Sequence, residues 1–245
     1  MPTDPATRHR NDMYGELEVD PAKAPEAVPA ATVVLLRESP DVEVLMLRKN
    51  SRIAFGGMWV FPGGRIDAED AAEDGDPEGT ARNAAARETR EEAGIAAAPD
   101  DFVWFAHWTP PPSTAKRFAT WFFAARAGEH AVSIDGGEIQ EHQWISPGAA
   151  LERHAAGEID LVPPTWVTLY HLSRYATVDG ILERFRSAEA TVYETHLGKR
   201  ADGVRVAMWS GDAGYDTGDA DTGGERHRLV MAEGGFVFEN TVMDY

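Results

Sequence analysis

A glycine turn followed by a charged helix most constrains how this chain can fold. The turn is Phe61-Pro62-Gly63-Gly64, and the run Arg87-Glu-Thr-Arg-Glu-Glu-Ala-Gly-Ile95 follows it. On a helix, Glu88, Glu91 and Glu92 are three and four residues apart, so their carboxylates share one face. Like charges at this spacing destabilise a helix by roughly a few tenths of a kcal/mol per pair. The sequence therefore predicts a positive charge against this face, and Mg²⁺ or Mn²⁺ suits such a cluster of oxygen ligands.

The helix that carries these glutamates has clear start and stop signals. Asp76 followed by Pro77 suits an N-cap and the first helical position. Gly94 suits the residue after the last turn, where a positive φ is easiest. We therefore expect a helix from Pro77 to Ala93. The acidic, turn-rich residues 67–79 read as a solvent loop inserted before it.

An alternative reading is that the charged run is an ordinary solvated helix face. The Phe-Pro-Gly-Gly turn before the run and Gly94-Ile95 after it favour a metal site instead.

Gly64 and the pattern Arg87-Glu88-x-x-Glu91-Glu92-x-Gly94-Ile95 resemble the Nudix box. This box is the signature of hydrolases that act on a nucleoside diphosphate linked to another group. The resemblance implies that Glu88, Glu91 and Glu92 hold Mg²⁺ or Mn²⁺, that Glu91 is catalytic, and that Arg87 orients the carboxylates. The chain has nine residues more than the box between Gly64 and Arg87. The box's first glutamate therefore falls on Asp70 when counted from Gly64, and on Gly79 when counted back from Arg87.

Two neighbouring segments resemble coenzyme A diphosphatases of this family, including their peroxisomal branch. The first runs from Leu45 through Arg48, Lys49 and Arg52 to Gly64, and the second is Lys116-Arg117-Phe-Ala-Thr-Trp-Phe-Phe123. The resemblance favours coenzyme A or its acyl esters as substrate, with dinucleotides, nucleotide sugars and nucleoside triphosphates as alternatives.

The substrate-binding residues expected from these segments are cations and glycines. A guanidinium matches a pyrophosphate in bidentate fashion, and we expect Arg117 on a strand that faces the diphosphate. Surface ion pairs are the alternative role for each arginine. The expected substrate-binding residues are Arg48, Arg52, Arg117, Gly63 and Gly64.

Hydrolysis also needs a group that takes a proton. The segment Glu138-Ile-Gln-Glu141-His-Gln-Trp144-Ile145 resembles the stretch in which a loop glutamate of the family binds metal or deprotonates water. Glu138 is the first candidate and Glu141 the second. The alternative is that both are solvated loop acids.

Composition narrows the class of protein. The net charge of −18 argues against a nucleic-acid polymer or an anionic membrane as partner. The chain has no cysteine, which excludes disulfides, thiolate zinc sites and a cysteine nucleophile. No apolar run reaches the roughly 18 residues of a membrane span, so we expect a cytoplasmic protein. The oligomeric state stays open, a homodimer included.

Strand and helix patterns set the expected organisation. Residues 1–29 read as a mobile tail, and strands are expected over 31–37, 42–48, 58–61, 102–109, 118–125 and 142–145. The resemblance implies an α/β fold, the Nudix α/β/α sandwich with a mixed sheet, over residues 30–146. Residues 147–245 are expected to pack on this core as an extension, with helices at 147–156, 163–175 and 179–188 and strands at 204–209, 228–232 and 235–239.

A function of another class is a catalytically silent, Nudix-like ligand sensor. Such a protein would usually have lost glutamates of the box, and this chain keeps Glu88, Glu91 and Glu92. The sequence therefore favours an enzyme.

Overall fold

The computed structural model describes residues 10–14, 24–51, 56–73, 75–114, 116–128 and 131–244. These residues belong to two compact units. The core unit contains Val28–Trp108 and Phe118–Val192. The second unit is drawn from three separate stretches, residues 1–27, 109–117 and 193–245.

The core unit is built on a mixed sheet with the strand order β3-β2-β1-β6-β5. The strands β1 and β6 are parallel, whereas the other neighbours are antiparallel. Two further strands join it, β4 beside β1 and β7 beside β2. The bounds are β1 Val28–Glu38, β2 Val42–Lys49, β3 Trp59–Val60, β4 Gly63–Arg65, β5 Val103–Thr109, β6 Phe118–Arg126 and β7 Ile139–Ile145.

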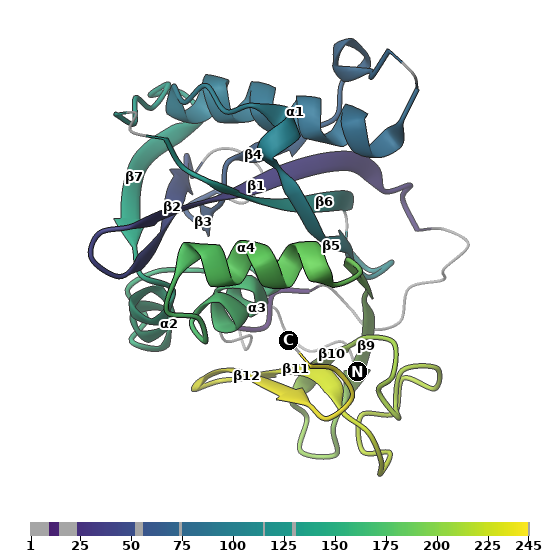
Figure 1. Ribbon diagram of the computed structural model, residues 1–245. Coiled ribbons are helices and arrows are strands. Elements are labelled where there is room, and N and C mark those ends of the chain that lie inside the picture. The colour runs from purple at the N-terminus through teal and green to yellow at the C-terminus, as the bar shows by residue number, and fades with distance from the viewer. Residues whose placement is uncertain are drawn as a thin grey trace. The chain divides into compact units, whose positions relative to one another are not determined.

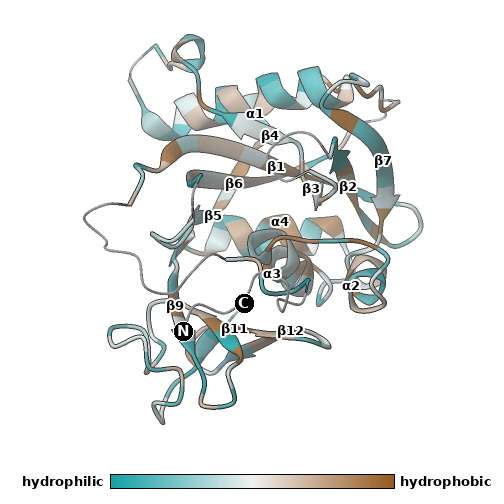
Figure 2. Ribbon diagram, turned by 180° about the vertical axis from the view of Figure 1, so that it is seen from behind, coloured by the Kyte–Doolittle hydropathy of each residue, from teal (hydrophilic) through white to brown (hydrophobic). Residues whose placement is uncertain are grey.

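Helices cover both faces of this sheet, which gives the α/β/α layers expected from the sequence. The helix α1, Pro77–Ala93, lies on one face, and α2, α3 and α4 lie on the other (Figures 1 and 2). Because both faces are covered, the middle of β1 is buried without interruption and reads as a continuous apolar run. The remaining helices are α2 Pro147–Ala155, α3 Pro163–Leu172 and α4 Val178–Ser187.

The bounds of α1 are those expected from its end signals. The carboxylate of Asp76 accepts hydrogen bonds from the backbone amides of Glu78 and Gly79. Gly94 ends the helix with φ at 68° and donates its N–H to the carbonyl of Arg90. The buried side of α1 carries alanines, which let the helix lie close to the sheet. Glutamates on the same helix are thereby brought near the strands.

The second unit contains a four-stranded antiparallel sheet with the order β12-β11-β10-β9. An ion pair is buried in this unit, with Nη2 of Arg228 2.5 Å from Oδ1 of Asp212. Residues near the N-terminus belong to the same unit, because Asn11 Nδ2 donates to the carbonyls of Ala232 and Glu233. The strands are β9 His196–Lys199, β10 Arg205–Met208, β11 His227–Ala232 and β12 Gly235–Asn240. The strand before them, β8 Thr191–Glu194, belongs to the larger sheet and lies at its edge beside β5.

Within the described ranges, none of the helices combines the length and the apolar character needed to cross a membrane.

Candidate functional site

The two glycines expected at the site begin the short strand β4. A Cβ atom on Gly63 would lie 2.5 Å from the carbonyl oxygen of Ala31, and one on Gly64 would overlap with Oε1 of Glu88. Any larger residue would therefore push β4 off β1 or displace the Glu88 carboxylate. The sequence predicts a turn at both glycines, but pairing with β1 makes them strand residues.

Glu92 is the most enclosed of the three box glutamates, with 4% of its surface exposed. Its Oε1 lies 2.7 Å from Nζ of Lys49, and its Oε2 accepts the backbone N–H of Gly63 at 3.0 Å. Burial raises the pKa of Glu92 above the ordinary value, although the charge of Lys49 opposes that shift. This carboxylate is therefore fixed in place but incompletely neutralised.

Lys49 also faces Glu138, the acid expected to handle the proton. Nζ of Lys49 lies 3.7 Å from Oε2 of Glu138, and the like charge of Glu138 raises the pKa of Glu92 further. The loop that carries Glu138 is fixed by the backbone, since its carbonyl accepts the N–H of Asn50 and its N–H bonds to Asp135. One ammonium thus faces both acids.

Sequence reasoning missed Lys49 as a site residue. The signal was available, because Lys49 ends a buried strand beside the glycine turn, where a cation needs a partner.

Arg87 holds the other two box glutamates. Its Nη1 lies 2.9 Å from Oε1 of Glu88 and 3.0 Å from Oε2 of Glu91. Its Nε and Nη2 bind the two oxygens of Asp70 at 2.9 and 3.0 Å. The expected contact of Arg87 with the glutamates is present, and Asp70 fixes the guanidinium from the other side.

The expectation that residues 67–79 form a solvent loop is wrong at Asp70. Residues Ala68–Asp70 form a 3₁₀ helix, and Asp70 is only 4% exposed. Burial acts to raise the pKa of Asp70, but the hydrogen bonds from Arg87 and from the backbone outweigh it and hold the pKa below the ordinary value. Of the two positions counted for the first glutamate of the box, Asp70 therefore contacts Arg87, whereas Gly79 has no side chain that could. The nine residues that the chain has in excess of the box come after Asp70.

The box carboxylates lie together without forming a finished metal cage. Among the residues that the structure describes, no three His, Cys, Asp or Glu side chains are close enough together to hold a metal ion as they stand. The side chain of Glu91 is 53% exposed. Burial raises the pKa of Glu88, and the negative charges of Glu92 and Glu91 raise it further.

These features fit a hard divalent cation. The donors are carboxylate oxygens, the absence of a side chain at Gly64 makes room for Glu88, and added positive charge would relieve the repulsion.

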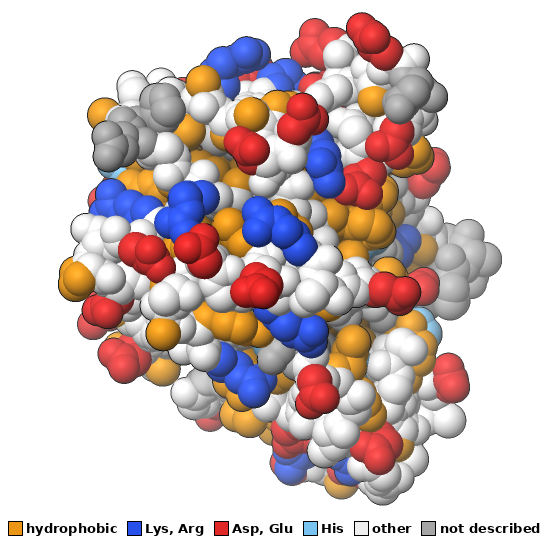
Figure 3. Space-filling model, viewed as in Figure 1, with side chains coloured by type: hydrophobic (Ala, Val, Ile, Leu, Met, Phe, Trp, Pro, Cys, Tyr) orange, Lys and Arg blue, Asp and Glu red, His pale blue; other side chains and the backbone are white. Residues whose placement is uncertain are grey.

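The arginines expected to bind substrate have other partners. Arg48 pairs with Glu141 at 2.9 Å on the surface, so these two candidates neutralise each other. Arg52 lies outside the described residues. Figure 3 shows Lys and Arg side chains interspersed with Asp and Glu on the face that it displays.

Arg117 does not lie on a strand, because β6 begins at Phe118. Its Nε and Nη2 donate to the carbonyl of Pro110, and its Nη1 donates to that of Pro25. The contact of Arg117 with a diphosphate stays a prediction.

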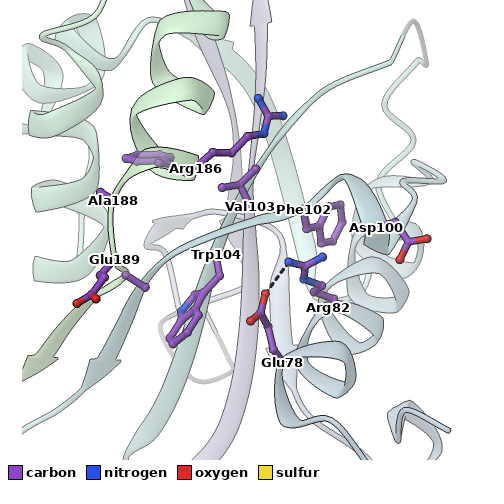
Figure 4. A pocket seen from close by; sticks show the side chains of 11 residues that line it. Glu78, Arg82, Asp100, Phe102, Val103, Trp104, Arg186, Ala188 and Glu189 are labelled. Atoms are coloured by element: carbon purple, nitrogen blue, oxygen red, sulfur yellow. Dashed lines mark hydrogen bonds and ion pairs between the residues drawn. The ribbon is translucent and has the colours of Figure 1, made fainter. Parts of the chain in front are cut away.

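A cavity of about 620 Å³ lies beside the N-terminal half of α1 (Figure 4). Arg82 and Glu78 from α1 face it, and they form an ion pair of 2.5 Å. Trp104 from β5 and Phe185 from α4 also line it. None of the site residues expected from the sequence lines this cavity.

Comparison with known proteins gives one family. The NUDIX domain family model matches residues 27–165, more than half of the chain. No curated protein matches the chain.

Several solved structures are similar to it. A NUDIX hydrolase from Alicyclobacillus acidocaldarius is 23% identical over 64% of this chain and 96% of that one, with a TM-score of 0.57. The NUDIX domain of Shewanella oneidensis NrtR, complexed with ADP ribose, is 19% identical over 64% and 92%, with a TM-score of 0.46. A MutT NUDIX hydrolase from Burkholderia pseudomallei is 16% identical over 60% and 98%, with a TM-score of 0.45.

Proposed function

The chain belongs to the Nudix domain family and is a Nudix-type pyrophosphohydrolase, and from this premise we propose which bond it cleaves and with which residues. Nudix hydrolases generally use divalent metal ions and act on small diphosphate compounds. The proposed reaction is Mg²⁺- or Mn²⁺-dependent hydrolysis of the pyrophosphate bond in a nucleoside diphosphate linked to another group. Coenzyme A and its acyl esters are the first substrates to test, because the segments around Arg48 and Arg117 resemble coenzyme A diphosphatases.

The proposal rests on Lys49, whose ammonium group pairs with both Glu92 and Glu138. Glu92 also accepts the backbone N–H of Gly63. Two acids that share one cation, next to the strand that makes room for Glu88, form a carboxylate cluster that suits a divalent ion, and such an ion would in turn bind the diphosphate.

Glu88, Glu91 and Glu92 are the proposed ligands of the ion. A bound Mg²⁺ or Mn²⁺ would neutralise the diphosphate and lower the pKa of a bound water. Arg87 and Asp70 keep Glu88 and Glu91 in place, because the guanidinium is fixed from both sides. In this proposal Arg87 and Asp70 act by positioning the carboxylates, and Glu91 belongs to the catalytic group.

Glu138 is the proposed proton acceptor. It is 64% exposed, so a water molecule can reach it, and its backbone is anchored beside β2. Lys49 keeps the carboxylate of Glu138 near that of Glu92 and supplies a cation for the diphosphate. Arg48, Arg52 and Arg117 stay proposed as further phosphate contacts, together with the backbone of Gly63 and Gly64.

The test is a panel of diphosphates incubated with the protein and Mg²⁺ or Mn²⁺, with products resolved by mass. The panel contains coenzyme A, an acyl-coenzyme A, an adenine dinucleotide, a nucleotide sugar and a nucleoside triphosphate. We expect cleavage between two phosphorus atoms and the highest kcat/KM for coenzyme A compounds. A preference for the triphosphate would contradict the assignment of coenzyme A as substrate. Absence of cleavage for every compound would contradict the proposed hydrolysis itself.

The matched variant is Glu92→Gln, which keeps the size of the side chain and removes its charge. We expect turnover to fall by about a hundredfold or more, because neutralisation of the transition state depends on this carboxylate. Glu43→Gln, the same change on β2 at a glutamate that pairs with Arg37, serves as the control on the same sheet. Activity of Glu92→Gln within threefold of the parent at saturating Mg²⁺ would remove Glu92 from the site.

A further inference from the structure

The loop that carries Glu138 is tied to the helix that carries the box glutamates. Residues 131–138 lead into β7, whose first residues lie near the end of α1 (Figure 1). The N–H of Ser133 donates to the carbonyl of Ala93, the last residue of α1, at 2.8 Å. Ile134 packs against the buried cluster between α1 and the sheet. The first part of the loop therefore keeps a fixed distance from α1.

The end of the same loop is tied to β2. Lys49 ends β2, and the next residue, Asn50, donates its backbone N–H to the carbonyl of Glu138 at 2.7 Å. The Nδ2 of Asn50 also donates to the carbonyl of Gly137, at 3.1 Å. The backbone of Glu138 is thus held beside Lys49, whose ammonium pairs with Glu92.

Asp135 closes this loop from within. Its Oδ2 accepts the N–H of Glu138 and its Oδ1 accepts the N–H of Ile139, both at 2.9 Å. The next residue, Gly136, has φ at 71°, a conformation that an L side chain rarely adopts, so the chain can turn back onto the carboxylate. Ile139 is fully buried at the start of β7, which gives the turn a fixed end.

The charge of Asp135 strengthens this arrangement. Burial acts to raise the pKa of Asp135, but the hydrogen bonds from the backbone N–H groups of Glu138, Ile139 and Gly137 outweigh it and hold the pKa below its ordinary value. The carboxylate is therefore ionised at pH 7, and an ionised acceptor forms stronger hydrogen bonds than a neutral one. Both of its oxygens accept backbone N–H groups, so this side chain acts on the shape of the loop.

The side chain of Glu138 needs this support. It is 64% exposed, and its Oε2 lies 3.7 Å from Nζ of Lys49, so this contact alone holds the carboxylate weakly. The position of the Glu138 carboxylate therefore depends mainly on the backbone that Asp135 fixes.

We propose that Asp135 is a positioning residue for hydrolysis, which places the carboxylate of Glu138 where it can take a proton from the attacking water. This inference rests on the proposed function, in which Glu138 accepts the proton. It adds a residue that acts through the backbone of Glu138 and not by contact with the substrate. A general base works only within hydrogen-bond reach of the proton that it removes, and a displacement of about 1 Å can lower the rate about a hundredfold.

The first test separates catalysis from substrate binding. Values of kcat and KM are measured with Mg²⁺ for the compound of the diphosphate panel that the parent cleaves fastest. In Asp135→Ala we expect kcat to fall by about tenfold or more, with KM within about twofold of the parent, because the substrate contacts are kept. The kcat of Asp135→Asn should lie within about threefold of the parent, because the amide oxygen can still accept one of the two backbone N–H groups.

A double-mutant cycle with Glu138→Gln shows whether the two residues act as a unit. Glu138→Gln alone should lower kcat by about a hundredfold or more, the contribution of a general base. Adding Asp135→Ala should then lower kcat by no more than about twofold further, because there is no longer a base to position. A purely structural role for Asp135 predicts that the two losses multiply, and that result overturns the inference.

Hydrogen exchange of the backbone amides, followed by NMR on the full chain, tests the same contact without substrate. The amides of Glu138 and Ile139 should exchange at least about tenfold faster in Asp135→Ala than in the parent. The matched control is Asp221→Ala, which removes an exposed carboxylate from the N–H of Ala201 in the second unit. It should leave kcat and the exchange of both loop amides unchanged.

The outcomes separate this inference from the proposed function. If Glu138→Gln is slow but Asp135→Ala keeps the kcat of the parent, or if the two amides keep their exchange rates, the inference is wrong while the proposed reaction stands. If Glu138→Gln keeps the kcat of the parent, the proposed proton acceptor is wrong and the inference falls with it. A failure of the reaction itself is seen as the absence of cleavage in the diphosphate panel.

Discussion

At the scale of single residues, the site is held by two cations that face different acids. The sequence predicts that positive charge stands against Glu88, Glu91 and Glu92, and in the fold Lys49 and Arg87 provide it. Lys49 is 12% exposed and its partner Glu92 is 5% exposed as side chains. Removing the charge of Lys49 would leave Glu92 as a buried carboxylate without its cation.

Lys49→Met tests this reading, because methionine keeps an unbranched side chain without the charge. In metal-free buffer we expect the free energy of unfolding to fall by about 1.5–3 kcal/mol, the range for hydrogen bonds to charged groups. Arg48→Met is the control, because its pair with Glu141 is exposed and such pairs contribute about 0–1 kcal/mol. Urea unfolding of both variants measures the difference, and equal losses would show that Lys49 is not a buried partner.

At the scale of elements, the helix α1 depends on its ends. Gly94 has a left-handed backbone, and a Cβ there would lie 3.0 Å from two atoms of Ser133. The residue therefore fixes both where the helix stops and how closely the following loop passes.

Gly94→Ala should lower the free energy of unfolding by about 1–2 kcal/mol, because an L-residue is strained in this conformation. The control is Gly148→Ala in the first turn of α2, where a Cβ meets nothing within 4 Å. That change should be neutral or slightly stabilising. Thermal unfolding compares the two, and a loss at Gly148 as large as that at Gly94 contradicts the argument.

Elements with local signals were predictable from the sequence, whereas those set by distant partners were not. The limits of α1 follow from Asp76, Pro77 and Gly94, all within the helix or next to it. The strand character of Gly63 and Gly64 depends on β1, more than thirty residues earlier. The burial of Asp70 depends on Arg87, and nothing near Asp70 in the chain indicates it.

The candidate site followed the same rule. The glutamates of α1 could be named as candidates because their spacing is a local pattern, Glu138 could be named by resemblance, and the roles of all four stay predictions. Lys49 was missed because its two partners come from α1 and from the residue just before β7. The short strands β8 and β9 were also missed, since neither has a clear alternation of apolar residues.

At the scale of the whole molecule, each unit has its own buried polar centre. In the second unit, Asp212 is fully enclosed and receives two hydrogen bonds from the guanidinium of Arg228, at 2.6 and 2.5 Å. The backbone amides of His227 and Gly214 donate to the same carboxylate. Burial acts to raise the pKa of Asp212, but these hydrogen bonds outweigh it and leave the pKa below its ordinary value.

This shift predicts an acid-sensitive second unit. A carboxyl group with a lowered pKa in the folded state stabilises the fold above its unfolded pKa, near 3.8, and that contribution is lost as the pH falls through the folded pKa. Urea unfolding between pH 7 and pH 2, followed by NMR signals of β10 and β11, measures it. Asp212→Asn should be less stable at pH 7 and should depend less on pH, and parallel curves for parent and variant would contradict the assignment.

The second unit pairs residues 10–14 with residues 205–233, and this affects the order in which the two units can fold during synthesis. Asn11 bonds to the carbonyls of residues 232 and 233, and Arg205 bonds to Asp12 and to the carbonyl of Tyr14. The ribosome makes residues 10–14 before the whole core unit, but their partners only some 190 residues or more later. At roughly 5–20 residues per second, that stretch of chain waits for about ten seconds or longer. The sheet of the core unit can fold during this interval, whereas residues 11, 12 and 14 meet their partners in the second unit only after residues 205–233 have been made.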